Sequence, residues 1–155
     1  MVVQSQTQTQ PKHELEIIKE VVVDASVEIT YRAVLAELGP ESEMPGGAPM
    51  PMVLEPWPGG RWFRDLGNNT GHLWAHVQVI KPPGLLELWG PTFMSYPAIN
   101  HIQYRLTADG AATKLKITHR AYGQIPPEAF QAEEGWVYGL KRIQEIAVRL
   151  KGEQR

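Results

Sequence analysis

The chain has 155 residues, enough for one domain with a buried core, and its 43% hydrophobic and 21% charged residues are ordinary for a globular protein. A net charge of −2 argues against a general attraction to nucleic acid, and the absence of cysteine excludes disulfides, thiol catalysis and thiolate metal sites. No run approaches the roughly 18 apolar residues of a membrane span, and the N-terminus lacks the pattern of a secretory signal, so we expect a cytoplasmic protein.

The first segments predict a tail, a strand and a helix. Residues 1–14 include a Gln/Thr-rich run with little to bury, and we expect a disordered tail followed by a single domain over residues 15–151. Leu15–Val23 is rich in β-branched residues and predicts a strand. The following apolar side chains have the spacing of one helix face: Val27, Tyr31, Val34 and Leu38. Gly39-Pro40 ends this helix.

The middle of the chain predicts an antiparallel sheet. Residues 39–51 are too rich in Pro and Gly for regular structure and predict a long, mobile loop. Five β segments follow, mostly joined by short turns: Arg61–Leu66, Gly71–Lys81, Leu85–Trp89, Ile99–Thr107 and Thr113–Tyr122. Alternation predicts these inward-facing side chains: Leu73, Ala75, Val77 and Val79, then Ile102, Tyr104 and Leu106, then Leu115, Ile117 and His119.

The last element is a long amphipathic helix, from Pro127 to Leu150. Its apolar face has helical spacing: Trp136, Leu140, Ile143, Ala147 and Leu150. Gly135 and Gly139 each cost about 1 kcal/mol of helix stability relative to Ala, which indicates that the helix must approach the sheet or leave space beside it. The order of elements predicts an α+β fold with helices on one side of an antiparallel sheet.

The glycine pair Gly59-Gly60 could begin a phosphate-binding loop or form a turn. The pair leads into "RWFRDL", which alternates like a strand, and no helix N-terminus follows to hold a phosphate. The sequence therefore favours a turn.

Several motifs in this order resemble the SRPBCC superfamily. "DASVEITYRAV" resembles the segment that joins the first strand to the first helix in that superfamily. Four further motifs resemble one branch of it, which is named after the activator of the 90-kDa heat-shock chaperone ATPase. These motifs are "PGGRWF", "GHLWAHVQVIKPPGLLELW", "TKLKITHRAYG" and "EEGWVYGLKRI". The resemblance covers roughly residues 15 to 150, and residues 39–51 depart from it, because the family usually has a second helix and a Trp there. It implies a helix-grip fold, in which a curved antiparallel sheet wraps around a long C-terminal helix.

The resemblance also implies a cavity for a hydrophobic or amphipathic small molecule between sheet and helix. Its expected lining is Trp62, Phe63, Tyr104, His119, Trp136 and Leu140. Two alternatives are a polyketide cyclase or aromatase-like enzyme, with His119, Tyr104 or Glu133 as acid or base, and a chaperone-interacting module. Against a catalytic role, His119 could satisfy a core hydrogen bond or pair with Tyr104, and Glu133 could be a solvated acid of the first helical turn.

No metal or cofactor is expected. His72 and His76 lie about 13 Å apart along a strand and cannot share one ion.

Trp74 and His76 are predicted to face outward, as Trp89 could, and an exposed tryptophan group indicates an interface such as a homodimer. The alternative is that the loop at residues 39–51 covers these side chains.

Overall fold

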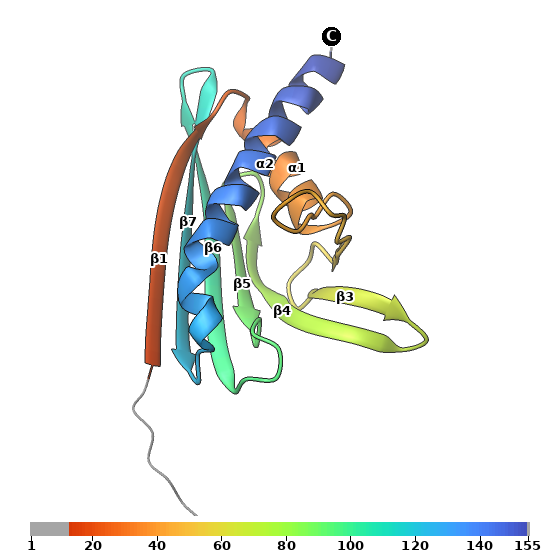
Figure 1. Ribbon diagram of the computed structural model, residues 1–155. Coiled ribbons are helices and arrows are strands. Elements are labelled where there is room, and N and C mark those ends of the chain that lie inside the picture. The colour runs from red at the N-terminus through yellow and green to blue at the C-terminus, as the bar shows by residue number, and fades with distance from the viewer. Residues whose placement is uncertain (1–12, 155) are drawn as a thin grey trace, which may run out of the picture.

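Alternating apolar strands produce one curved sheet, and two helices cover one of its faces (Figure 1). The computed structural model describes residues 13–154. The strands are β1 (His13–Val23), β2 (Val53–Leu54), β3 (Arg61–Gly67), β4 (Thr70–Lys81), β5 (Leu85–Gly90), β6 (Ala98–Asp109) and β7 (Ala112–Gly123). All neighbours pair antiparallel, in the order β1-β7-β6-β5-β4-β3-β2. The α+β class and the helix-grip arrangement predicted above are confirmed.

The first strand and the last helix extend slightly beyond their predicted bounds. β1 begins at His13 rather than Leu15, and the last helix runs to Glu153 rather than ending near residue 150. The rest of the predicted tail, residues 1–12, lies outside the described residues. Across residues 13–154, no helix combines the length and the apolar character needed to cross a membrane.

Helix α1 (Val27–Leu38) begins where the sequence offers a capping residue. The Ser26 hydroxyl accepts a hydrogen bond of 3.3 Å from the backbone N–H of Ile29, which satisfies one of the free donors of the first turn. The predicted apolar face is buried or packs against the core, and Ile29 and Ala33 widen it. This wider face lets α1 contact both the sheet and the C-terminal helix.

The C-terminal helix crosses the sheet along its concave side (Figure 1). The chain enters it through a 3-10 turn, η1 (Pro127–Gln131), and then forms α2 (Ala132–Glu153). The predicted apolar face is confirmed, with Leu140, Ile143 and Ala147 buried. The Gln144 side chain donates to the Val22 carbonyl at 2.9 Å, which ties the helix to the first strand.

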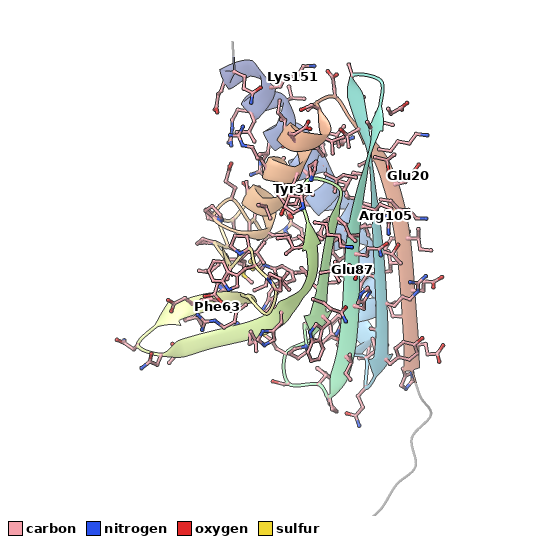
Figure 2. All side chains as sticks on the ribbon, turned by 180° about the vertical axis from the view of Figure 1, so that it is seen from behind. Glu20, Tyr31, Phe63, Glu87, Arg105 and Lys151 are labelled. Atoms are coloured by element: carbon pink, nitrogen blue, oxygen red, sulfur yellow. The ribbon has the colours of Figure 1, made fainter. Side chains whose placement is uncertain are left out.

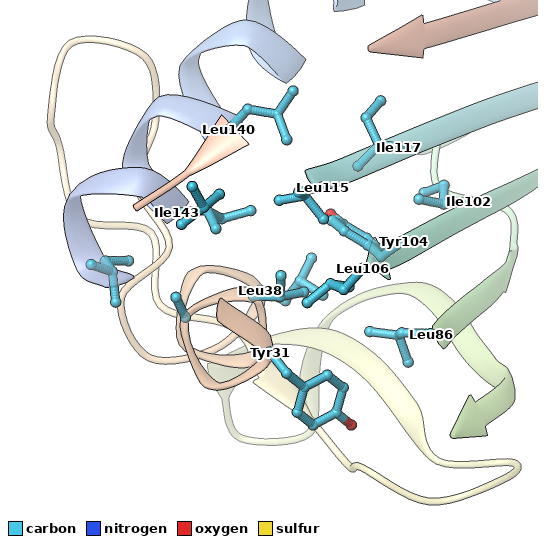
Figure 3. Close-up of a cluster of buried hydrophobic side chains, with 14 of the residues drawn as sticks. Tyr31, Leu38, Leu86, Ile102, Tyr104, Leu106, Leu115, Ile117, Leu140 and Ile143 are labelled. Carbon is cyan, nitrogen blue, oxygen red and sulfur yellow. The ribbon is translucent and has the colours of Figure 1, made fainter. Parts of the chain in front are cut away.

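The core lies between α2, α1 and the inner face of the sheet, as Figure 3 shows. Its fully buried side chains from the sheet include the alternating sets predicted on β6 and β7. Tyr104 and Leu115 have no exposed surface, and His119 is only 2% exposed. The period of two along these strands therefore identifies the inner face correctly.

The prediction for β4 is wrong at both ends, because the strand contains two bulges. Trp62 pairs with Ala75 and Phe63 pairs with Leu73, so Trp74 is an extra residue between the two pairs. A bulge reverses the alternation beyond it. Leu73 consequently lies outside with 44% of its surface exposed, and Trp74 packs against the core instead of facing outward.

The second irregularity in β4 lies between Val77 and Val79, and here Ile80 packs against the core in place of the predicted Val79. Trp89, whose orientation the sequence left open, faces outward, with 46% of its surface exposed and its ring 6.3 Å from that of His76. The predicted exposed group thus keeps Trp89 and His76 but loses Trp74.

The turn predicted at Gly59-Gly60 is confirmed. Gly59 has φ +82°, and the Gly60 N–H donates to the Trp57 carbonyl at 2.8 Å. A Cβ atom on Gly60 would lie 2.0 Å from the Glu55 carbonyl oxygen, so only glycine fits this close approach. The pair serves to direct the chain into β3.

Candidate functional site: a cavity beneath the C-terminal helix

A cavity of about 260 Å³ lies between α2 and the inner face of the sheet. Apolar side chains from distant parts of the sequence meet around it, among them Leu38 of α1, Ile102 of β6 and Leu140 of α2 (Figure 3). The loop at residues 39–51 and the segment around Phe93 form its remaining walls. The volume is close to the lower end of the roughly 300–1,000 Å³ range of small-molecule sites.

The two glycines of α2 contribute to this space. Gly135 and Gly139 both line the cavity, and a Cβ atom placed on Gly135 would meet nothing within 4 Å. A Cβ atom on Gly139 would lie 3.2 Å from a carboxylate oxygen of Glu37. Gly139 leaves room for Glu37 of α1 and not for the sheet, and Gly135 lies exposed at the edge of the cavity.

Five of the six predicted lining residues meet at this cavity: Trp62, Tyr104, His119, Trp136 and Leu140. Phe63 does not, because alternation turns it away from Trp62. It lies on the projecting β3–β4 hairpin, where the Arg61 guanidinium sits 4.5 Å from its ring centre (Figure 2). Glu133 is also outside the cavity, since its carboxylate is exposed and pairs with Lys19 of β1.

His119 sits in a hydrogen-bonded chain that uses both of its ring nitrogens. The indole N–H of Trp136 donates to His119 Nδ1 at 3.0 Å, so this nitrogen carries no hydrogen. Nε2 therefore holds the ring hydrogen and donates it to Asn100 Oδ1 at 2.7 Å. The Asn100 amide donates onward to the Pro91 carbonyl at 2.9 Å, which fixes the orientation of the amide.

This arrangement keeps His119 neutral. Burial lowers the pKa of His119 to about 4. A proton on Nδ1 would also point at the Trp136 N–H, which has no lone pair to accept it. His119 therefore organises one wall of the cavity and does not offer a free base. Of the alternatives that the sequence left open, it makes core hydrogen bonds and does not pair with Tyr104.

Two further polar groups near the cavity have no partner among the described residues. The Tyr104 hydroxyl and the Trp74 indole nitrogen are both buried without a hydrogen bond. Burial, and then the nearby charge of Glu37, raise the pKa of Tyr104 well above its ordinary value, so the phenol stays neutral. An unsatisfied buried group typically costs about 1–3 kcal/mol. These groups mark the inner wall as a place where bound water or ligand atoms would be stabilised.

Glu37 is the residue at the cavity that sequence reasoning missed. It lies in the last turn of α1, lines the cavity, and makes no side-chain hydrogen bond or ion pair within residues 13–154. Burial raises the pKa of Glu37 to about 7, against the smaller opposing effect of the Arg142 charge. Near neutral pH, both the protonated and the ionised form of this carboxyl group are therefore populated. The only signal in the sequence is an acid beside Leu38, at the edge of an apolar helix face.

The loop at residues 39–51 is held against α2, which differs from the mobile loop predicted. The Tyr138 hydroxyl donates to the Glu43 carboxylate at 2.7 Å, and Arg142 lies 3.2 Å from the same oxygen. Arg149 forms a two-pronged pair with Glu41, at 2.6 Å for both contacts. Sequence patterns could not reveal these contacts, because they join residues about a hundred positions apart.

Two other hollows lie on the outer surface. One, of about 700 Å³, follows the β3–β4 hairpin around Phe63, Asn68 and His72, and the other, of about 530 Å³, lies near Met94 and Tyr96. Neither is enclosed by the core, and the first is lined largely by turn residues and charged side chains. The smaller cavity under α2 is therefore the better candidate site.

Comparison with known proteins supports the fold. No family model and no curated protein matches the chain. An uncharacterised protein from Rhizobium leguminosarum has a similar structure, with a TM-score of 0.67 and 16% identity over 90% of this chain and 97% of that one. CalU16 from Micromonospora echinospora is similar with a TM-score of 0.59 and 18% identity, over 83% of this chain and 71% of CalU16.

DynU16, a protein of the dynemicin biosynthetic locus, is similar with a TM-score of 0.63 and 18% identity, over 84% of this chain and 46% of DynU16. At identities this low, the three likenesses establish a shared helix-grip fold and nothing about shared chemistry. Membership of the SRPBCC superfamily, and of the branch that the motifs resemble, stays a prediction.

Proposed function

We propose that this protein binds a hydrophobic or amphipathic small molecule in the cavity beneath α2. The observation that carries the proposal is the space itself, which remains open beneath α2 in a core that close packing would otherwise fill. Most of the lining is apolar, so a ligand would be stabilised by about 25 cal/mol per Å² of buried apolar surface, before the costs of association.

A neutral fluorescent dye tests this proposal. N-phenyl-1-naphthylamine has about 17 non-hydrogen atoms, and roughly 0.3 kcal/mol per atom gives a Kd on the order of 100 μM. Three tryptophans line the cavity, at positions 62, 74 and 136, so bound dye should quench their emission by energy transfer. Native mass spectrometry of the purified protein would show whether a cellular ligand is retained.

A pair of variants at Gly135 locates the binding. Gly135→Leu places a large side chain at the exposed edge of the cavity, and it should weaken dye binding while leaving the protein as stable as the wild type or more so. Gly135→Ala adds one methyl group and should keep binding within about twofold, with a similar gain in helix stability of about 1 kcal/mol. Undiminished dye binding by a folded Gly135→Leu protein would show that the dye does not bind beside Gly135.

A second candidate function is catalysis on the same scaffold, of the cyclase-like kind considered above. Glu37 supports it, since a half-buried carboxyl with a pKa of about 7 suits a general acid or base at neutral pH. Three other groups were considered from the sequence. Glu133 is exposed, and His119 is hydrogen-bonded at both ring nitrogens. The pKa of Tyr104 is raised well above its ordinary value by burial, so its phenol is a poor proton donor at neutral pH. Any turnover should therefore be lost in Glu37→Gln and retained in Glu133→Gln, and the reverse result would refute this assignment.

A further inference from the structure

The charged groups that line the cavity are all acidic. They are Glu37 and Glu43, and across residues 13–154 neither lysine nor arginine contributes to the lining. Glu43 is compensated, because Arg142 lies 3.2 Å from its carboxylate and the Tyr138 hydroxyl donates to it at 2.7 Å. Glu37 has neither an ion pair nor a hydrogen bond among the described side chains, so its negative charge is the uncompensated one at this site.

Among the lining side chains that the structure describes, none supplies a positive charge. His119 is the nearest candidate, but its Nδ1 accepts a hydrogen bond from Trp136 and it stays neutral above a pH of about 4. Arg142 acts on Glu37 only through space and is already engaged with Glu43. An anionic ligand would thus meet an acid without a compensating cation.

The rest of the lining suits a cation well. Trp62, Trp74, Phe93 and Trp136 all line the cavity, together with the ring of Tyr104. Aromatic faces attract ammonium groups with about 0.5–2 kcal/mol, and the attraction grows when water is excluded. A cavity whose lining combines a carboxylate with indole rings is a favourable environment for an alkylated ammonium group.

We propose that the cavity selects molecules that carry a positive charge on an apolar body, such as an aryl or alkyl ammonium, with Glu37 as the counter-charge. This inference rests on the proposed function, because it specifies the class of ligand for the same cavity. A bound cation would hold Glu37 ionised, so the binding of a permanent cation should weaken as Glu37 takes up a proton.

Four other ionisable groups face this region: Arg142 and Glu43, which form an ion pair, Tyr104, whose pKa is raised well above its ordinary value, and His119, whose pKa is lowered to about 4. Tyr104 and His119 therefore keep their charge state between pH 6 and pH 8, whereas Glu37 has a pKa of about 7. The ionised fraction of Glu37 changes about tenfold over this interval, which sets the expected change in affinity.

The test uses benzyltrimethylammonium and its neutral carbon isostere neopentylbenzene, each displacing N-phenyl-1-naphthylamine at pH 8 and pH 6. The wild type should bind the cation at least tenfold more tightly than the isostere at pH 8, and the advantage should shrink about tenfold at pH 6. Glu37→Gln should remove both effects. Glu28→Gln is the matched control, since Glu28 is an exposed acid of the same helix, and it should behave as the wild type.

The outcomes separate this inference from the proposed function. Equal binding of cation and isostere, or an unchanged preference in Glu37→Gln, would overturn the charge selection while leaving a small-molecule site in place. Binding of phenylbutyrate more tightly than the ammonium would also overturn it. If neither the dye nor any of the three probes binds, both the inference and the proposed function fail. Circular dichroism of each variant confirms that it is folded.

Discussion

The indole N–H of Trp136 donates to Nδ1 of His119 over 3.0 Å, and this contact joins α2 to the sheet beside the cavity. The two rings meet edge to face, with their centres 5.6 Å apart and their planes at 70°. Through Asn100 the same chain of hydrogen bonds reaches the Pro91 carbonyl. The helix, two strands and a loop are therefore coupled at one wall of the site.

Removing the donor should weaken this wall. Trp136→Phe leaves His119 Nδ1 without a partner, and we expect the free energy of unfolding to fall by about 1–3 kcal/mol in urea denaturation. The pKa of His119 should also rise above its value of about 4, because a proton on Nδ1 would no longer face an N–H group. An NMR titration of the imidazole measures it. Trp89→Phe, at an exposed position, should change neither quantity, and equal effects of the two substitutions would contradict this account.

Glu37 should make the folded state less stable as pH rises. Burial raises the pKa of Glu37 from 4.5 to about 7, so between these values the folded state keeps a proton that the unfolded state has lost. Its contribution to stability is fully present below pH 4.5 and is lost as pH rises to about 7. Glu37→Gln should therefore gain stability relative to the wild type across this window, by roughly 3 kcal/mol above pH 7. A constant difference between the two proteins from pH 4.5 to 8 would show that Glu37 is not buried.

His119 should have the opposite effect. Its pKa is lowered from 6.5 to about 4, so its contribution to stability is present above pH 6.5 and is lost as pH falls towards 4. His119→Gln keeps an acceptor and a donor but does not titrate, and it should be less sensitive to acid than the wild type over this range. Chemical denaturation at half-unit pH steps measures the difference. His13→Gln, on the exposed first residue of β1, is the control, and a matching response there would remove His119 as the cause.

Trp62 should stabilise the end of α1. Its indole N–H donates to the Leu38 carbonyl at 2.7 Å, one of the last carbonyls of the helix, which has no partner within the helix itself. Trp62→Phe should lower the free energy of unfolding by about 1–2 kcal/mol, as measured in urea, because a buried acceptor loses its donor. Trp57→Phe, at a position with 55% of its surface exposed, should have little effect. An unchanged unfolding midpoint in Trp62→Phe would refute this role.

The sequence predicted those parts of the fold that follow from local periodicity. The apolar face of α2 and the alternation along β6 and β7 identified His119, Tyr104 and Leu140 as inward-facing, since each pattern is regular over several turns or residues. β4 failed because an extra residue at Trp74 reverses the alternation, and the residues themselves carry no sign of a bulge.

The parts of the site that could not be predicted depend on contacts between distant segments. From the sequence alone, Glu37 belongs to the polar side of α1. Only the packing of α2, at Gly139, places it against another helix. The loop at residues 39–51 has a composition typical of mobile segments, yet Tyr138 and Arg142 hold its Glu43. Both cases involve partners that no periodicity within one element can identify.

The five tryptophans provide the most direct test of a ligand site beneath α2, because their indole N–H signals are resolved in one two-dimensional NMR spectrum. Trp62, Trp74 and Trp136 line the cavity, whereas Trp57 and Trp89 are exposed on the surface. Titration with N-phenyl-1-naphthylamine should shift the three cavity signals with a single Kd and leave the two surface signals in place. Shifts confined to Trp57 and Trp89, or no shifts at saturating dye, would contradict the proposed function.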